Sequence, residues 1–349
     1  MLTSITQWHD RLNAGTTDDE EPRVRQFGLR PVVHGQGWGQ SAPTPEVWAW
    51  QQPDGRPSAT PTSGDVRVGF TARRFHLGHV GLARSVAQTL PEDGRVLLFG
   101  GPDTDQGAVR LFEHMLTWFG APDCSVEVVP DDDDALRRTQ REALAVLHVG
   151  KLARVYGWDD STPASVFTDL GTMLGAFLHA PSRADRRDVV FVDAKQAAHS
   201  VALARAGRAL GLPTPTLLYR RLFPSLRLPT GRGSVKDPAS TIFLDDAPAD
   251  VRRKVRSAVT GGRDHVDDQR ARGGDPVQCP LFASVELLRP ADEAQATLVA
   301  CQSGDLLCGE CKALHVEAVA RSVVDLGTPS LRAGGRRPAT AGAGSGDRP

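Results

Sequence analysis

Two histidines one helical turn apart form the motif of this chain whose spacing most directly suggests chemistry. They lie in the run Phe75–His79, Phe-His-Leu-Gly-His, which follows the apolar segment 66–70. Residues three positions apart share one helix face, so both imidazoles point the same way. Gly78 lets a ligand approach the backbone closely, and a helix start after the first strand of an α/β sheet binds anions. His76 and His79 are therefore candidate contacts to the phosphates and adenine of ATP. The alternative is two ordinary surface histidines on a capping turn.

A second candidate is the loop 231–238, Gly-Arg-Gly-Ser-Val-Lys-Asp-Pro, which combines glycine, hydroxyl and cationic residues. Arg232, Ser234 and Lys236 in such a loop can grip a pyrophosphate group through charge-assisted hydrogen bonds. The same composition is also typical of a flexible linker. The loop becomes informative only together with the histidine turn.

The cysteines are a third candidate site. Four of the five are clustered, with 21, 6 and 2 residues between them, at Cys279, Cys301, Cys308 and Cys311. In a cytosolic chain such clustering indicates metal ligands before disulfides. Four thiolates suit an iron–sulfur cluster or Zn²⁺. Free thiols are the remaining alternative.

Composition excludes some classes of protein. The 349 residues include 41 basic and 42 acidic side chains, a net charge of −1, which argues against nucleic-acid binding through overall positive charge. There is no apolar run of membrane-spanning length and no pattern typical of a secretory signal at the start. We therefore expect a cytoplasmic protein that contacts no membrane.

The elements that must position these residues follow an α/β pattern from residue 66 onward. Strands that alternate with helices of this length predict a parallel, doubly wound sheet. The strands are expected at 66–70, 95–99, 125–129, 189–192 and 216–219. The helices are expected at 76–90, 105–119, 131–149 and 195–210, with further helices at 248–259 and 290–325.

This pattern predicts four regions. Residues 1–64 form an irregular N-terminal extension, which is either partly ordered or a flap over the active site. Residues 65–246 form a Rossmann-like catalytic domain, interrupted by a helical insertion at about 151–180. Residues 247–326 form a smaller helical domain. Residues 327–349 have almost no apolar content and are expected to be disordered.

The histidine turn and the 231–238 loop together resemble the two signatures of class I aminoacyl-tRNA synthetases. Within that class, the run 234–244 with its continuation at 254–264 resembles tryptophanyl-tRNA synthetases of the archaeal and eukaryotic type. The runs 211–215 and 222–226 fit the same family. The resemblance covers roughly residues 66–326.

The resemblance implies ATP- and Mg²⁺-dependent activation of an amino acid, followed by transfer to tRNA, in a homodimer. By position, the ATP and amino-acid contacts would include Phe70, Thr71, Gly78, Lys195, Gln196 and His199. Because some bacterial members carry a [4Fe–4S] cluster on almost the same cysteine spacing, the resemblance favours a cluster, with Zn²⁺ as second choice. The helical domain corresponds to the one that reads the anticodon.

Several positions depart from the family pattern. Arg232 stands where the first lysine of the signature loop is usual, and an arginine does not replace a lysine neutrally. Gly233 replaces a methionine, and Lys236 replaces a serine. Residues 100–105 lack the family's acids and lysine, and the first strand lacks its tyrosine. These departures predict that tryptophan is a poor substrate or is bound through different contacts. They also leave open a paralogue that serves a non-tRNA acceptor, or a non-catalytic binding protein.

Overall fold

The computed structural model consists of two compact units. It describes residues 2, 4–14, 26–31, 47–51, 64–70, 74–90, 94–100, 106–179, 188–193, 196–228 and 231–328. One unit, the sheet unit, comprises residues 13–73 and 82–222. The other, the helical unit, comprises residues 1–12, 74–81 and 223–349. The predicted tail beyond residue 328 lies outside the described residues.

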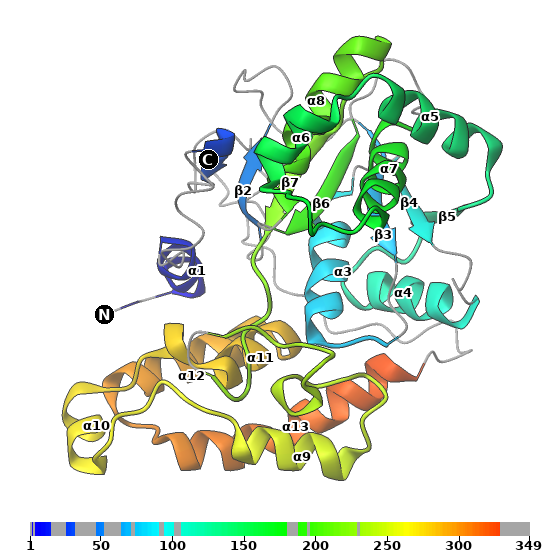
Figure 1. Ribbon diagram of the computed structural model, residues 1–349. Coiled ribbons are helices and arrows are strands. Elements are labelled where there is room, and N and C mark those ends of the chain that lie inside the picture. Colours follow the sequence, from blue (N-terminus) through cyan, green and yellow to red (C-terminus); the bar gives the residue numbers. More distant parts are fainter. Residues whose placement is uncertain are drawn as a thin grey trace, which may run out of the picture. The chain divides into compact units, whose positions relative to one another are not determined.

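The sheet unit is built on seven strands in the order β1-β2-β7-β6-β3-β4-β5 (Figure 1). Five are parallel, and all five were expected from the sequence: β3 (Val66–Phe70), β4 (Arg95–Gly100), β5 (Ser125–Pro130), β6 (Val189–Asp193) and β7 (Thr216–Arg220). The order places β3, the first of the five parallel strands in the sequence, between β6 and β4, where the winding reverses. The prediction of a Rossmann-like parallel sheet is confirmed.

The N-terminal region is less irregular than expected. Strand β2 (Val47–Gln51) pairs antiparallel with β7, and the two-residue strand β1 (Arg30–Pro31) pairs with β2. The Tyr219 hydroxyl donates to Gln51 at 2.9 Å, which ties the added strand to β7. Helix α1 (Ile5–Ala14) precedes them. The composition of residues 1–64 does not predict these strands, because β2 is stabilised by pairing with β7, which lies far away in the sequence.

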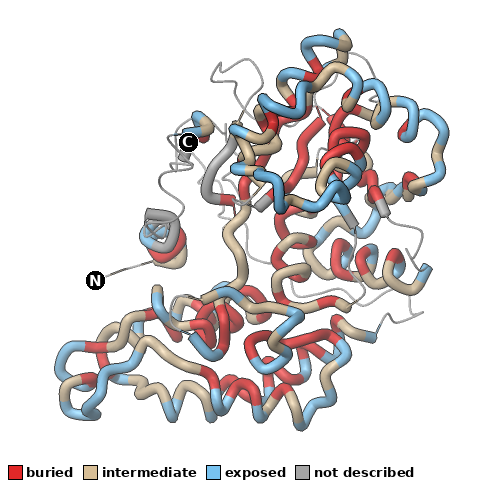
Figure 2. Tube along the Cα trace, in the orientation of Figure 1, coloured by how far each residue is buried: buried red, intermediate tan, exposed pale blue. Residues whose placement is uncertain are grey.

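Helices cover the parallel strands because both faces of these strands are apolar. The face that carries Leu97, Val190 and Leu217 packs in one core with α5 (Asp134–Ala145), α6 (Val149–Tyr156), α7 (Ser165–Leu178) and α8 (His199–Leu210). Val66, Val68 and Leu98, which alternate with this face, are also buried (Figure 2). The remaining helices are α3 (Leu77–Thr89) and α4 (Gln106–Trp118). The helical insertion expected at 151–180 corresponds to α6 and α7.

Two predicted helix starts are displaced. The helix expected at 131–149 begins at Asp134, because the Asp133 side chain accepts the Leu136 backbone N–H at 2.7 Å and caps it. It ends at Ala145, and α6 begins separately at Val149. The helix expected at 195–210 begins at His199.

Within the described residues 231–328, the helical unit contains five α-helices: α9 (Pro248–Ser257), α10 (Val266–Arg272), α11 (Pro280–Leu288), α12 (Ala291–Ser303) and α13 (Cys308–Gly327). Helix α1 belongs to this unit. Its Trp8 is buried beside Phe282 and donates its indole N–H to the Pro276 carbonyl at 3.0 Å. Helices α10 and α11 were not expected. The single helix expected at 290–325 is two helices, because α12 ends at Ser303 before Gly304, which has φ +82°, and α13 begins at Cys308. Among the described residues, no helix has both the length and the apolar character to cross a bilayer.

Candidate functional site

The histidine turn is held by the segment that follows the 231–238 loop. The Leu77 N–H donates to the Ile242 carbonyl at 3.1 Å, and the Leu244 N–H donates to the Phe75 carbonyl at 2.9 Å. These two bonds form an antiparallel bridge between His76 and Phe243. Both candidate motifs therefore belong to the helical unit, although α3 itself continues into the sheet unit. The sequence did not reveal this pairing, because an isolated bridge leaves no pattern.

Hydrogen bonds from backbone N–H groups determine which nitrogen of each imidazole carries the proton. The Gly78 N–H donates to His76 Nδ1 at 3.0 Å, and the His76 N–H donates to His79 Nδ1 at 3.2 Å. A ring nitrogen that accepts a hydrogen bond carries no proton, so each neutral ring carries its proton on Nε2. The two rings, with centroids 4.2 Å apart, therefore offer N–H donors that suit phosphate and ribose oxygens.

Gly78 is required by the position of the His76 ring. A Cβ atom at residue 78 would lie 2.7 Å from Cε1 and 2.9 Å from Nδ1 of that ring. The glycine thus makes room for the imidazole that accepts its own N–H. This is a local reason for glycine, in addition to the approach of a ligand that the sequence suggested.

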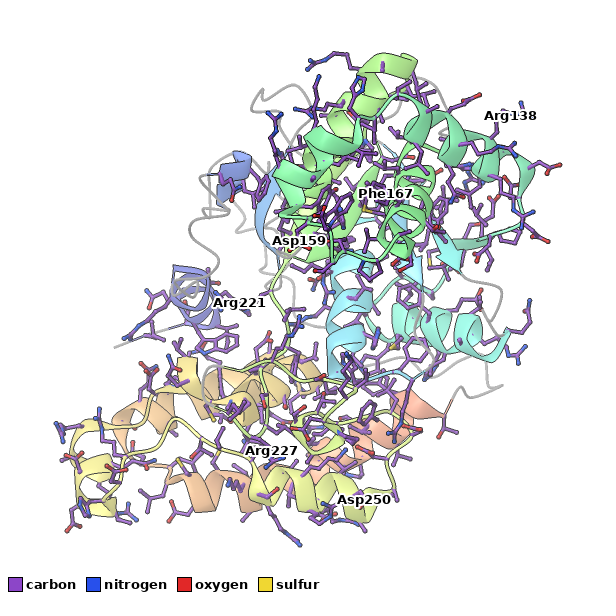
Figure 3. The ribbon with its side chains drawn as sticks, in the orientation of Figure 1. Arg138, Asp159, Phe167, Arg221, Arg227 and Asp250 are labelled. Carbon is purple, nitrogen blue, oxygen red and sulfur yellow. The ribbon has the colours of Figure 1, made fainter. Side chains whose placement is uncertain are left out.

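Hydrogen bonds to two serine hydroxyl groups hold the 231–238 loop in its conformation. The Ser240 hydroxyl accepts the Ser234 N–H at 2.9 Å, and the Ser234 hydroxyl accepts the Lys236 N–H at 3.2 Å. Arg232 and Lys236 are exposed, and in the described part of the chain no carboxylate lies within ion-pair distance of either. Arg227, by contrast, pairs with Asp237 at 3.5 Å (Figure 3 labels Arg227). Two of the three cations around the loop thus lack a carboxylate partner.

An ionic hub that sequence reasoning missed supports the bridge. The buried Asp246 carboxylate accepts Lys254 Nζ at 2.6 Å, Arg74 at 3.3 Å and the Phe243 N–H at 2.9 Å. The Phe243 ring lies 3.8 Å from the Arg74 guanidinium carbon and 4.9 Å from Lys254 Nζ, both cation–π distances. The hub links the residue before the histidine turn to helix α9. Residues 74, 246 and 254 follow no periodicity, so no sequence pattern predicts the hub.

The remaining predicted site residues lie in the sheet unit or outside the described residues. Gln196 is half-buried, and His199 is the first residue of α8, after the carboxyl end of β6. Phe70 ends β3, but its side chain lies outside the described residues, as do Thr71 and Lys195. His199 Nδ1 lies 2.8 Å from the hydroxyl oxygen of Tyr156, a residue of the insertion that the sequence did not single out.

The four clustered cysteines are on neighbouring elements of the helical unit. Cys279 caps α11, Cys301 lies in the last turn of α12, and Cys308 begins α13. Burial raises the pKa of the Cys301 and Cys311 thiols to about 12, and the charges of the other clustered cysteines add to both shifts. Burial also raises the pKa of Cys279. As metal-free thiols, Cys279, Cys301 and Cys311 are therefore protonated at neutral pH.

Glycine makes room for sulfur in this cluster. A Cβ atom at Gly262 would lie 2.6 Å from Cys308 Sγ, and one at Gly274 would lie 3.0 Å from Cys301 Sγ. The Gln269 amide donates to Cys308 Sγ at 3.3 Å. Four half-buried thiols on neighbouring elements are, by residue type, the donors that bind metal as thiolates. Within the described ranges, no three His, Cys, Asp or Glu side chains are close enough to form a metal site as they stand.

Comparison with known proteins identifies relatives. No family model matches the chain. It is 37% identical over 162 residues to the tryptophan–tRNA ligase of Pyrobaculum aerophilum. The matched segment covers 45% of this chain and 42% of that protein. It is 36% identical over 107 residues to the tryptophan–tRNA ligase of Pyrococcus abyssi, 30% of this chain and 28% of that protein. The chain thus matches less than half the length of these curated relatives.

Solved structures share the fold of this chain over most of its length. The tryptophanyl-tRNA synthetase of Aeropyrum pernix superimposes with a TM-score of 0.68 and 23% identity, covering 90% of this chain and 94% of that one. The tyrosyl-tRNA synthetase of the same organism gives 0.55, with 16% identity, over 77% and 84%. The chain is similar to archaeal tryptophan–tRNA ligases over less than half of their length. This similarity supports the family resemblance predicted from the sequence, and the structural likeness confirms the fold class. The individual site residues remain predictions.

Proposed function

We propose that the protein activates an amino acid, tryptophan or a related one, with ATP. The substrate carboxylate attacks the α-phosphorus, the bond from that phosphorus to the bridging oxygen breaks, and an aminoacyl-adenylate and pyrophosphate result. No protein nucleophile is required, because positioning and stabilisation of charge supply the catalysis. Mg²⁺ on the phosphates would supply part of that charge.

The observation that carries this proposal is the pairing of the two motifs in one unit. The histidine turn, in which each neutral ring carries its proton on Nε2, is bonded directly to the segment that follows the 231–238 loop. His76 and His79 would contact phosphate and ribose. Arg232, Ser234 and Lys236 would close over the leaving pyrophosphate. Phe70, Thr71, Gly78, Lys195, Gln196 and His199 would complete the contacts to ATP and amino acid.

The wider assignments follow from the same proposal. Transfer of the aminoacyl group to tRNA would follow in a cytoplasmic homodimer, with residues 247–326 as the anticodon-binding-like domain. The departures at Arg232, Gly233 and Lys236 favour one alternative, a paralogue that passes the activated amino acid to a non-tRNA acceptor or only binds ligand. An ATP–pyrophosphate exchange assay with all common amino acids tests activation. A charging assay with total tRNA separates the acceptors.

Replacing His79 by Ala is expected to weaken adenylation at least ~10-fold, which corresponds to about 1.4 kcal/mol. The change removes an Nε2–H donor and frees the His76 N–H that the ring now accepts. Pyrophosphate exchange and ATP titration measure the effect. His265→Ala is the matched control, because His265 is an exposed histidine of the same unit. Unchanged exchange in His79→Ala would remove the turn from the proposed ATP site.

We further propose that Cys279, Cys301, Cys308 and Cys311 hold a [4Fe–4S] cluster, with Zn²⁺ as second choice. Its role would be structural, since it joins the ends of α11, α12 and α13. Protein purified without oxygen is expected to be brown, with absorbance near about 400 nm. Cys308→Ser is expected to lose most of the iron, whereas Cys124→Ser, in the sheet unit, retains it. Colourless protein without iron or zinc, with four titrating thiols, would contradict the proposal.

A further inference from the structure

A stacked aromatic group in the helical insertion contacts one residue of the proposed site. Tyr156 is the last residue of α6, and its ring stacks on Trp158 with centroids 4.5 Å apart and an interplanar angle of 13°. Gly157, with φ +69°, turns the chain so that the Trp158 N–H donates back to the Ala153 carbonyl. Phe167 of α7, labelled in Figure 3, contacts the Trp158 ring edge-on, with ring centroids 4.8 Å apart. The stack on Trp158, which Phe167 supports in turn, therefore fixes the position of the Tyr156 ring within the insertion.

The polar end of Tyr156 is directed to His199. The hydroxyl oxygen lies 2.8 Å from His199 Nδ1, and the two ring centroids are 5.4 Å apart. His199 is the first residue of the 12-residue helix α8. The pair therefore connects the insertion to the turn at the carboxyl end of β6, where α/β sheets bind ligands.

The direction of this hydrogen bond follows from its two partners. Burial raises the pKa of the Tyr156 hydroxyl, so the group keeps its proton at neutral pH. Within the described residues, His199 Nδ1 is the partner recorded for that hydroxyl, and donation to it satisfies the O–H. The positive end of the α8 dipole opposes an imidazolium at its first residue. A neutral ring whose Nδ1 accepts carries its proton on Nε2.

We propose that Tyr156 is a positioning residue for amino-acid activation: its hydroxyl holds His199 in the neutral tautomer with the proton on Nε2. His199 then presents a hydrogen-bond donor, in a fixed orientation, to the substrates of the proposed site. This inference rests on the proposed function. It adds Tyr156, a residue of the insertion, to the proposed site. It also assigns the tautomer of His199, which the position of that residue in the motif does not define.

The test compares Tyr156→Phe with Tyr219→Phe. The first keeps the stacked ring and removes only the hydroxyl. The second removes the hydroxyl of the chain's other tyrosine, which donates to Gln51. The tautomer of His199 is measured from imidazole ¹⁵N shifts in histidine-labelled protein, with His199→Gln to assign its signals. Exchange kinetics are measured on the same samples, and circular dichroism checks the fold.

The wild type and Tyr219→Phe are expected to show the Nε2–H tautomer of His199. Tyr156→Phe is expected to show mixed tautomers and at least a ~10-fold loss in kcat/KM for exchange. An unchanged tautomer in Tyr156→Phe would overturn the proposal, and so would a changed tautomer with unchanged exchange. If the wild type exchanges with no amino acid, the proposed function fails and the positioning role fails with it. The ¹⁵N shifts then still decide whether the hydrogen bond exists.

Discussion

Asp188→Ala is expected to destabilise the sheet unit by about 3–5 kcal/mol, because it leaves a buried guanidinium without its counter-ion. Arg67, on β3, is 2% exposed and donates to Asp188 through Nε at 2.7 Å and also through Nη2. Its Nη1 donates to the carbonyls of Ala176 at 2.8 Å and Phe177 at 3.0 Å. Burial lowers the pKa of Arg67, and the charge of Asp188 opposes that shift.

Urea unfolding monitored by circular dichroism measures this effect. Glu127→Ala is the control, since Glu127 pairs with Arg95 at the surface and an exposed pair contributes about 1 kcal/mol or less. The double variant Arg67→Met with Asp188→Leu is expected to recover part of the loss, because it removes both charges together. A midpoint for Asp188→Ala close to that of Glu127→Ala would show that the buried pair contributes little.

Asp246→Ala is expected to have a comparable effect on the helical unit, about 3–5 kcal/mol, and also to weaken ATP binding. The change leaves the Lys254 ammonium, 6% exposed, without its carboxylate and frees the Phe243 N–H. Because Phe243 is bridged to His76, we expect the turn to lose its fixed geometry. The KM for ATP should therefore rise at least ~10-fold, the equivalent of about 1.4 kcal/mol.

Thermal unfolding and exchange kinetics together test this second effect. Arg253→Ala is the matched control, because Arg253 is adjacent to Lys254 but pairs with Asp250 in solvent (Figure 3 labels Asp250). We expect Arg253→Ala to resemble the wild type in both measurements. If Asp246→Ala also keeps the wild-type KM for ATP at a temperature where it is folded, the hub does not position the histidine turn.

The strands were predictable because their chemistry is local. The five parallel strands are short apolar runs bounded by turn residues, and their alternation with helices gave the fold class. Strand β2 was not predictable, because its place beside β7 depends on residues about 170 positions away. The start of α5 was misplaced for a different reason. Four consecutive aspartates each suit a helix N-terminus, and only the structure identifies Asp133 as the cap.

The sequence predicts the motifs of the candidate site but not the contacts that hold them in place. His76, His79 and the 231–238 loop stand out by residue type, and the comparisons support the family from which their roles are carried over. Tyr156 and Asp246 do not stand out. A tyrosine at the end of a helix and an aspartate before one are common, and their importance arises from partners 43 and 8 residues away. Such pairs appear only when the chain is folded.

The composition of the helical unit from three separate segments has a consequence during synthesis of the protein. Residues 74–81 emerge from the ribosome early, but their partners Ile242 and Leu244 follow more than 160 residues later. The strands of the sheet unit are complete once Arg220 has emerged, whereas the histidine turn cannot be fixed at that stage. The nascent chain therefore contains every strand of the sheet unit before the partners of the histidine turn have been synthesised. In the proposed function, the ATP site is complete only after these late residues have joined the turn.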